Sequence, residues 1–137
     1  SDLFLIGFDL KKDPVTLHNA YNDSKGVTAR FNLNVLHRIN CDLGADFDLT
    51  KFAHYAYYNE SCSRIKMYLK SLSSQTVTIP ESNLSIDLTK DELIHTENSY
   101  KFSIFQIESL FEKSGIKINK IWYDSRKYFA LVLGQKI

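Results

Sequence analysis

The stretch that decides the fold comprises residues 3–9, with the sequence LFLIGFD. No polar residue interrupts it from Leu3 to Phe8, and it ends in Asp9. This pattern is typical of a strand covered on both faces, as in a parallel sheet. A strand of this kind needs neighbours, and it begins almost at residue 1. We therefore expect an α/β fold in a chain that is part of a longer protein.

Two helices are predicted after this strand. Pro14 can occupy the first turn of a helix that ends between residues 22 and 25. Gly26 opens a longer helix that Gly44 closes. Along it, apolar residues recur at spacings of three and four, which indicates one buried face made of Val27, Phe31, Val35, Leu36, Ile39 and Leu43.

The middle of the chain is predicted to be β-structure. Residues 52–58 and 64–72 alternate between apolar and polar side chains, which favours an antiparallel pair with Ile65, Met67 and Leu69 on one face. Turn-forming residues separate three further strands. These are predicted at residues 75–79, 84–88 and 92–99.

The end of the chain predicts one helix and a closing hairpin. Ser103 is a suitable N-cap for a helix that runs to Gly115. Residues 116–123 and 128–133 then indicate two strands.

Composition narrows the class of partner. The chain has 137 residues, and its 17 Lys and Arg residues against 16 Asp and Glu leave a net charge of +1, with no block of one sign. This balance argues against nucleic acid or a membrane surface and favours a small molecule. No apolar run approaches the roughly 20 residues of a membrane span, so a cytoplasmic protein is expected. The four histidines have no neighbour at metal-ligand spacing, and no metal is assigned.

Several separated motifs resemble one family in the same order. They lie at residues 7–13, 20–23, 26–29, 31–34, 46–48, 64–67 and 94–101. Together they resemble the histidine-specific, S-adenosylmethionine-dependent N-methyltransferases, which include the enzyme that makes hercynine for ergothioneine. Trp122 and Asp124 fit the closing hairpin of that family. The resemblance covers essentially the whole chain, which makes it far more specific than one short motif.

The resemblance implies an α/β, or α+β, fragment in two parts. Residues 1–10 and 102–137 would be the C-terminal part of a Rossmann-like methyltransferase domain. Residues 11–101 would form the histidine-binding domain, with an antiparallel sheet and two helices. The Gly-rich donor loop, the acidic residue for the ribose and the Asn for the substrate carboxylate would lie upstream of residue 1. S-adenosylmethionine would therefore be bound mainly outside this chain.

The same resemblance gives Glu97 and Ser99 to the imidazole of L-histidine. A carboxylate can accept an N–H from one ring nitrogen while a hydroxyl satisfies the other. Two residues apart on a strand, both side chains project from one face. Without the resemblance, an exposed polar face on an edge strand is the simpler interpretation.

Tyr21 and Thr28 complete the substrate site that the resemblance implies. Tyr21 would lie near the backbone end of the amino acid, although a tyrosine at a helix end is the plain alternative. Thr28 would reach the pocket directly or through water, or serve only at the helix entry. We also expect Asn98 to face away from Glu97, and His95 to share its face. No catalytic residue is assigned.

In the family, the α-amine of histidine attacks the sulfonium methyl repeatedly until a trimethylammonium betaine forms. The fragment alone is expected to be inactive. The alternative is a non-catalytic module that binds an amino acid or amine, or that dimerises. Uncovered apolar strands also predict self-association. A Gly-rich strand-loop-helix upstream would favour the enzyme.

Overall fold

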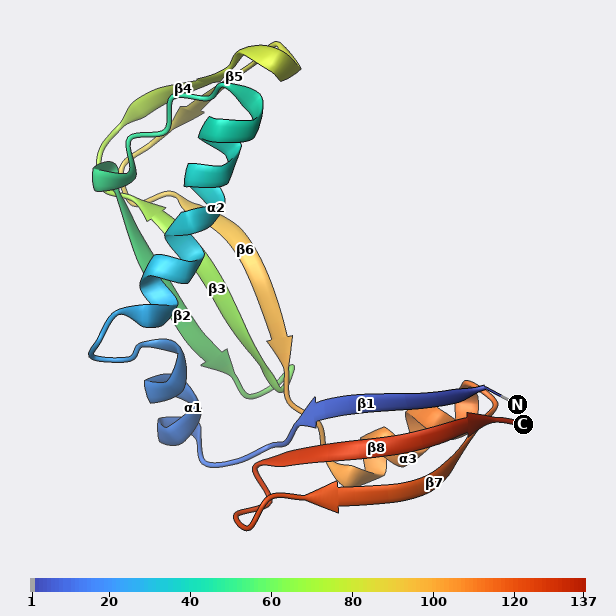
Figure 1. Cartoon of the computed structure of the whole chain (residues 1–137). Helices are drawn as coiled ribbons and strands as arrows, with labels where there is room; N and C mark the ends of the chain where they lie inside the picture. The colour runs from blue at the N-terminus through green and yellow to red at the C-terminus, as the bar shows by residue number, and fades with distance from the viewer. Residues whose placement is uncertain (1) are drawn as a thin grey trace.

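The computed structural model describes residues 2–137 and divides them into two parts that meet at an angle (Figure 1). In chain order the elements are β1 (Leu3–Asp9), α1 (Pro14–Tyr21), α2 (Val27–Leu43), η1 (Leu49–Lys51), β2 (Phe52–Asn59), β3 (Arg64–Ser71), β4 (Gln75–Ile79), η2 (Pro80–Ser82), β5 (Leu84–Leu88), β6 (Leu93–Tyr100), α3 (Ile104–Lys113), β7 (Ile116–Tyr123) and β8 (Phe129–Lys136). The helices and strands that the sequence predicts are all present, with small differences at their ends.

The first part is a three-stranded sheet in the order β1-β8-β7, called here the terminal sheet. All its pairings are antiparallel. Helix α3 packs on one face through Ile107 and Phe111, and the sheet supplies Phe8, Ala130 and Val132 to the same core. The predicted N-cap is confirmed, because Ser103 and Gln106 form a reciprocal capping box.

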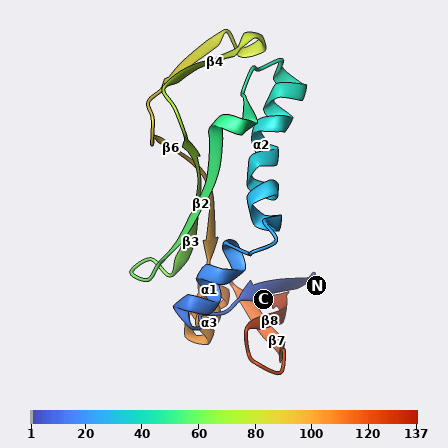
Figure 2. The same cartoon turned by 90° about the vertical axis from the view of Figure 1, so that its left-hand side faces the viewer.

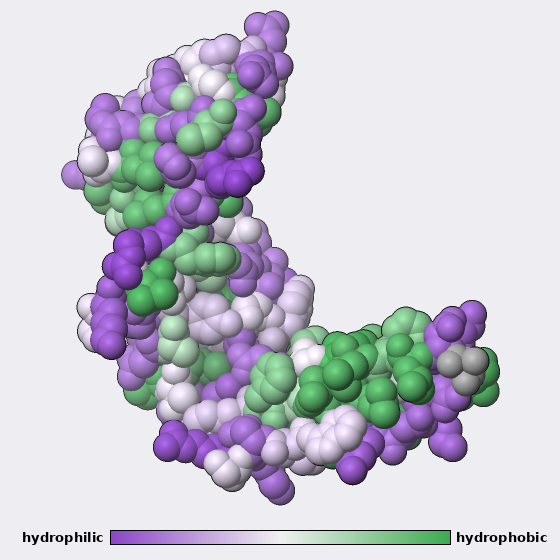
Figure 3. Space-filling model, in the orientation of Figure 1, coloured by the Kyte–Doolittle hydropathy of each residue, from purple (hydrophilic) through white to green (hydrophobic). Residues whose placement is uncertain are grey.

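Strand β1 corrects one expectation. It was predicted to be covered on both faces, yet Leu3 and Leu5 are 61% and 60% exposed. Within residues 2–137, β8 pairs with one edge of β1, and no element covers the face that Leu3 and Leu5 share. Figure 3 shows apolar surface over this sheet. The strand has the sequence of a buried element, but the described chain leaves its side chains open.

The second part is built on an antiparallel sheet in the order β2-β3-β6, called here the central sheet. Ile65, Met67 and Leu69 are at most 1% exposed, which confirms the alternation predicted for β3. Helices α1 and α2 lie along this face (Figure 2), where Leu17 and Leu36 pack against it. An antiparallel sheet with two helices is the predicted α/β composition of this part.

Helix α2 confirms its predicted ends but not its predicted face. It ends at Gly44, whose positive φ of 62° suits glycine. Only Asn32 and Leu36 are buried along it, whereas Phe31 is 66% exposed and Val35 is 45% exposed. The apolar residues occupy two stripes, and only the stripe with Leu36 faces the sheet. The face predicted from the periodic pattern of α2 therefore combined residues of a buried face with residues of an exposed one.

The two parts are joined by two segments that run side by side. Leu10 and Phe102 form an isolated parallel bridge. The Phe102 N–H donates to the Asp9 carbonyl at 2.9 Å, and the Lys11 N–H donates to the Phe102 carbonyl at 3.0 Å. This junction places the end of β1 next to the end of β6.

Gly134 sets a packing limit between β8 and α3. An added Cβ would lie 2.6 Å from both Phe111 Cε1 and Ile116 Cγ2. Phe111 is only 2% exposed and has little room to move. We expect Gly134→Ala to lower the free energy of unfolding by about 1–3 kcal/mol through overpacking, measured by urea denaturation.

Gly7 provides the control for this prediction. A Cβ there would meet the tip of the Phe129 ring, which is 46% exposed and can turn away. Gly7→Ala should therefore cost clearly less than Gly134→Ala. Equal losses for the two variants would contradict the argument from packing.

Candidate functional site

A β-bulge in β6 decides which of its side chains face the helices. Met67 pairs with Glu97, but the next residue, Tyr68, pairs with His95, so Thr96 is an extra residue. Glu97 therefore shares the covered face of Met67. The expectation that His95 shares the Glu97 face is wrong, because the bulge restarts the alternation.

His95 and Asn98 lie on the outer face of the central sheet. The His95 ring is 4.9 Å from the Tyr68 ring, and its Nε2 is 3.1 Å from Asn98 Oδ1. The prediction that Asn98 faces away from Glu97 is confirmed. The face that the helices cover therefore carries Glu97, Ser99 and the residue two positions after Ser99.

Glu97 borders a shallow cavity between β6 and α2, with a volume of about 170 Å³. Its lining consists of Phe31, Asn32, Asn34, Val35, Arg38, Thr96 and Glu97. Within residues 2–137, the Glu97 carboxylate has no hydrogen-bond or ion-pair partner. A carboxylate beside an exposed aromatic ring and a cavity is free to accept an N–H from a small ring.

Ser99 and Tyr21 meet although 78 residues separate them. The Tyr21 hydroxyl is 2.7 Å from Ser99 Oγ, and Lys101 donates to both oxygens, at 2.8 Å and 2.7 Å. The Lys101 ammonium also lies 4.7 Å from the centre of the Tyr21 ring. The end of α1 and the end of β6 thus share one polar cluster.

Asp9 neutralises the buried lysine in this cluster. The Lys101 side chain is fully buried, and its ammonium lies 2.7 Å from Asp9 Oδ2. Lys12 holds the other carboxylate oxygen. Because a buried charge without a partner is very costly, Asp9 stabilises the cluster from the end of β1.

A chain of hydrogen bonds from α2 holds the Tyr21 backbone. The Asn32 amide donates to the Tyr68 carbonyl at 2.9 Å and lies 3.0 Å from His54 Nδ1. His54 Nε2 is 2.8 Å from the Tyr21 carbonyl. Since Nδ1 accepts from the amide, Nε2 carries the proton and donates to Tyr21. Asn32 is buried on α2, so this chain of bonds links α2, β2, β3 and the end of α1.

Removing the Asn32 amide should destabilise the chain. In Asn32→Leu, the Tyr68 carbonyl and His54 Nδ1 lose their donor. An unsatisfied buried polar group costs about 1–3 kcal/mol, and we expect a loss of that size in urea denaturation. Asn34→Leu on the exposed side of the same helix is the matched control. Similar losses for both variants would contradict this role.

Thr28 lies in the first turn of α2. Its N–H donates to Asp23 Oδ1 at 2.9 Å, and its hydroxyl is 3.4 Å from the Ala20 carbonyl. The Val27 N–H donates to the other oxygen of Asp23. These backbone hydrogen bonds, that of Thr28 first, lower the pKa of Asp23 to about 2. In this structure the described contacts of Thr28 serve the helix entry.

Three residues near the site were not predicted from the sequence. Lys101 carried a usable signal, because it follows Ser99 by two positions on the same strand face. Phe31 was assigned to a buried helix stripe but borders the cavity beside Glu97. Asn32 gave no signal, since a polar residue within an apolar helix pattern is normally assigned to the surface.

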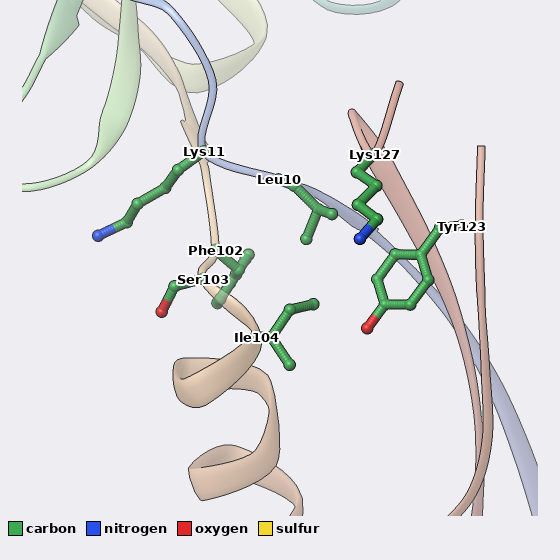
Figure 4. Close-up of a pocket in the computed structure, with 7 residues that line it drawn as sticks. All are labelled: Leu10, Lys11, Phe102, Ser103, Ile104, Tyr123 and Lys127. Atoms are coloured by element: carbon green, nitrogen blue, oxygen red, sulfur yellow. The ribbon is translucent and has the colours of Figure 1, made fainter. Parts of the chain in front are cut away.

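A second cavity lies at the junction of the two parts of the described chain. The cavity at the carboxyl end of β1 has a volume of about 320 Å³ and lies beside the start of α3 (Figure 4). It is lined by Leu10, Lys11, Phe102, Ser103, Ile104, Tyr123 and Lys127. This lining has two lysines and no carboxylate that could accept hydrogen bonds from ribose hydroxyls. The nearby Asp9 carboxylate already forms ion pairs with Lys12 and Lys101.

Residues 2–137 lack two kinds of feature. No group of three or more His, Cys, Asp or Glu side chains is placed to hold a metal ion. No helix has the length and apolar character needed to cross a membrane.

Comparison with known proteins gives the family. Residues 1–136 match the family described as SAM-dependent, histidine-specific methyltransferases. The chain belongs to this family. The resemblance seen in the sequence motifs is therefore confirmed across nearly the whole chain.

Three known methyltransferases are similar to the chain. The histidine N-alpha-methyltransferase of Mycolicibacterium smegmatis is 39% identical over 132 residues, covering 96% of the chain and 41% of the relative. That of Mycobacterium tuberculosis is 38% identical over 135 residues, covering 98% and 42%. An L-tryptophan methyltransferase of Psilocybe serbica is 25% identical over 132 residues, covering 96% and 37%. The chain thus spans about two-fifths of the length of these relatives.

Proposed function

We propose that this chain is the histidine-binding part of an enzyme that methylates the α-amine of L-histidine with S-adenosylmethionine. Membership of the family and the histidine N-alpha-methyltransferases among its relatives support the reaction. The observation that best supports L-histidine as the substrate is the unpaired Glu97 carboxylate, which lies on the same strand face as the Ser99 hydroxyl. The carboxylate accepts a hydrogen bond from one imidazole N–H, and the hydroxyl forms a hydrogen bond with the second ring nitrogen.

The proposal assigns the remaining site residues by their distance from this ring site. Tyr21, bonded to Ser99, contacts the backbone end of the amino acid. Thr28 holds the α2 entry close to Tyr21 and reaches the substrate only through water. Residues 11–101 act as the histidine-binding domain, and residues 1–10 with 102–137 belong to the methyltransferase domain.

Catalysis in this proposal rests on positioning. A displacement by an amine needs a deprotonated nucleophile held in line, and orientation alone can supply much of the rate. The chain's own residues hold and orient histidine, whereas the methyl donor binds mainly outside them. The chain alone is therefore inactive. The cytoplasmic location expected from the sequence is part of the same proposal.

Calorimetric titration of the 137-residue chain with L-histidine tests the substrate. We expect weak, saturable binding that Glu97→Ala abolishes. The longer protein that contains the chain should transfer methyl groups from S-adenosylmethionine to L-histidine, detected by mass spectrometry, and the chain alone should not. Methylation of L-tryptophan in preference to L-histidine by the longer protein would overturn the substrate assignment.

A second candidate is a non-catalytic module that binds an amine or dimerises. The open apolar face of the terminal sheet favours it, because Leu3, Leu5 and Leu131 are at least 36% exposed there. Apolar surface of this kind drives association in water. Sedimentation of the chain should show self-association. A monomer at all concentrations would remove this support.

A further inference from the structure

Lys101 is a fully buried cation whose ammonium joins three separate elements. Its nitrogen lies 2.7 Å from Asp9 Oδ2 at the end of β1, 2.8 Å from the Tyr21 hydroxyl at the end of α1 and 2.7 Å from Ser99 Oγ on β6. An ammonium has three N–H donors, so these three contacts use all of them. No N–H is left over for a ligand, and Lys101 can act on a substrate only through the groups that it holds.

The two hydroxyls depend on Lys101 for their positions. Within residues 2–137, the Tyr21 and Ser99 oxygens bond only to each other, at 2.7 Å, and to Lys101. The bond between the hydroxyls alone leaves both side chains free to turn together about their rotatable bonds. The buried ammonium removes that freedom, because it bonds both oxygens and is itself held by Asp9.

Stability alone does not account for a buried ion pair at this place. Taking two charges out of water is costly, so apolar residues of similar volume are often at least as stable as a buried pair. The Asp9 carboxylate also has a second partner in Lys12 and would stay paired without Lys101. What Lys101 alone adds in the described chain is its bonds to Tyr21 and Ser99.

The anchor of this ammonium belongs to the other part of the fold. Asp9 ends β1 of the terminal sheet, and its carbonyl accepts the Phe102 N–H at 2.9 Å where the two parts join. Tyr21 and Ser99 lie in the part built on the central sheet. One ammonium thus ties two hydroxyls of the second part to the end of a strand of the first.

We propose that Lys101 is a positioning residue for the substrate. Held by Asp9, it fixes the two hydroxyls that contact histidine, and so sets where the amino acid lies relative to the terminal sheet. The inference rests on the proposed function, because it takes the Tyr21 and Ser99 hydroxyls as contacts of the amino acid. An in-line methyl transfer depends closely on the position of the amine, so a substrate that is held loosely binds and reacts less well.

The test is steady-state kinetics of L-histidine methylation in the longer enzyme proposed above. Lys101→Met keeps the approximate length of the side chain and removes its three donors. We expect the KM for L-histidine to rise about tenfold, which is the equivalent of one hydrogen bond lost to the substrate. Partial unfolding instead lowers kcat with the amount of active enzyme and leaves the KM unchanged. An unchanged KM in Lys101→Met overturns the proposal.

Lys12→Met is the matched control. Lys12 pairs with the other oxygen of Asp9, and its side chain is only 12% exposed, but it bonds neither Tyr21 nor Ser99. The substitution removes one cation from the same carboxylate and should leave the KM for L-histidine close to that of the wild type. A rise equal to that of Lys101→Met would assign the effect to lost charge rather than to lost position, and the proposal would fail.

Variants of the hydroxyls show whether Lys101 acts through them. In the double variant Tyr21→Phe with Ser99→Ala, the ammonium has no hydroxyl left to hold. Adding Lys101→Met to this background should change the KM far less than it does in the wild type, because residues that share one set of contacts are not additive. An equal rise in the two backgrounds contradicts the proposal.

Asp9→Asn gives a test that does not depend on whether Lys101→Met folds. The amide keeps an oxygen for the ammonium but weakens the anchor, so the KM for L-histidine should rise by a smaller factor than in Lys101→Met. A KM equal to that of the wild type would refute the anchoring. Wild-type enzyme that does not methylate L-histidine overturns the proposed function, whereas active wild type with unchanged KM in these variants overturns only the role of Lys101.

Discussion

We expect Glu97→Ala to lower kcat/KM for the methylation of L-histidine by about one to two orders of magnitude in the longer enzyme proposed above. The carboxylate has no partner within residues 2–137, so in the proposed complex it accepts the imidazole N–H. A hydrogen bond to a charged group is worth about 1.5–3 kcal/mol, and each 1.4 kcal/mol corresponds to a factor of ten. Steady-state methylation kinetics with L-histidine measure the loss.

Two variants act as controls for this result. Glu97→Gln keeps an oxygen acceptor without the charge and should lose less than Glu97→Ala. Glu108→Ala replaces an exposed carboxylate on α3, far from the cavity, and should leave kcat/KM unchanged. An unchanged kcat/KM in Glu97→Ala would remove Glu97 from the site.

Asp9→Ala should give the largest loss of stability among the charged residues. The Lys101 side chain is fully buried, and Asp9 is the carboxylate that neutralises it. Breaking a buried pair by removing one partner costs about 3–5 kcal/mol, because the other charge stays buried without compensation. Asp9 is 31% exposed, so water can partly replace it, and we expect about 3 kcal/mol. Urea denaturation gives the free energy of unfolding.

The exposed pair of Lys70 and Asp91 provides the matched control. Its atoms lie 2.7 Å apart, as in the buried pair, but the side chains are 39% and 60% exposed. Asp91→Ala should cost clearly less than Asp9→Ala, because the charges of this exposed pair are already solvated. The double variant Asp9→Ala with Lys101→Met should recover part of the loss, since no charge is left unpaired. A cost for Asp9→Ala no larger than that for Asp91→Ala would contradict this account.

The positions of the helices and strands could be predicted because local patterns determine them. The alternation around Met67, the glycine after α2 and the capping box of α3 are each written within a few neighbouring residues. What covers a strand is not local. The open face of β1 could not be foreseen from Leu3 and its neighbours, because coverage depends on elements elsewhere.

In the candidate site, too, some features follow from the local sequence and others depend on elements far apart in the chain. Alternation on a strand was enough to put Glu97 and Ser99 on one face, whereas the bulge that turns His95 away changes the register without a sequence signal. The meeting of Tyr21 with Ser99 spans 78 residues and depends on how α1 packs. The resemblance brought both residues to one site but gave no role to Lys101, which joins them.

The bulge at Thr96 also bears on how the substrate range of such a site can diverge. Thr96 stands outside the pairing of β3 with β6, and its Oγ1 is buried without a hydrogen-bond partner in the described chain. It borders the same cavity as Glu97 and Phe31. Replacements at this unpaired position can reshape the cavity while the register that orients Glu97 and Ser99 is preserved. Strand β6 thus has one position, Thr96, that can change during evolution while the neighbouring residues Glu97 and Ser99 keep their orientation.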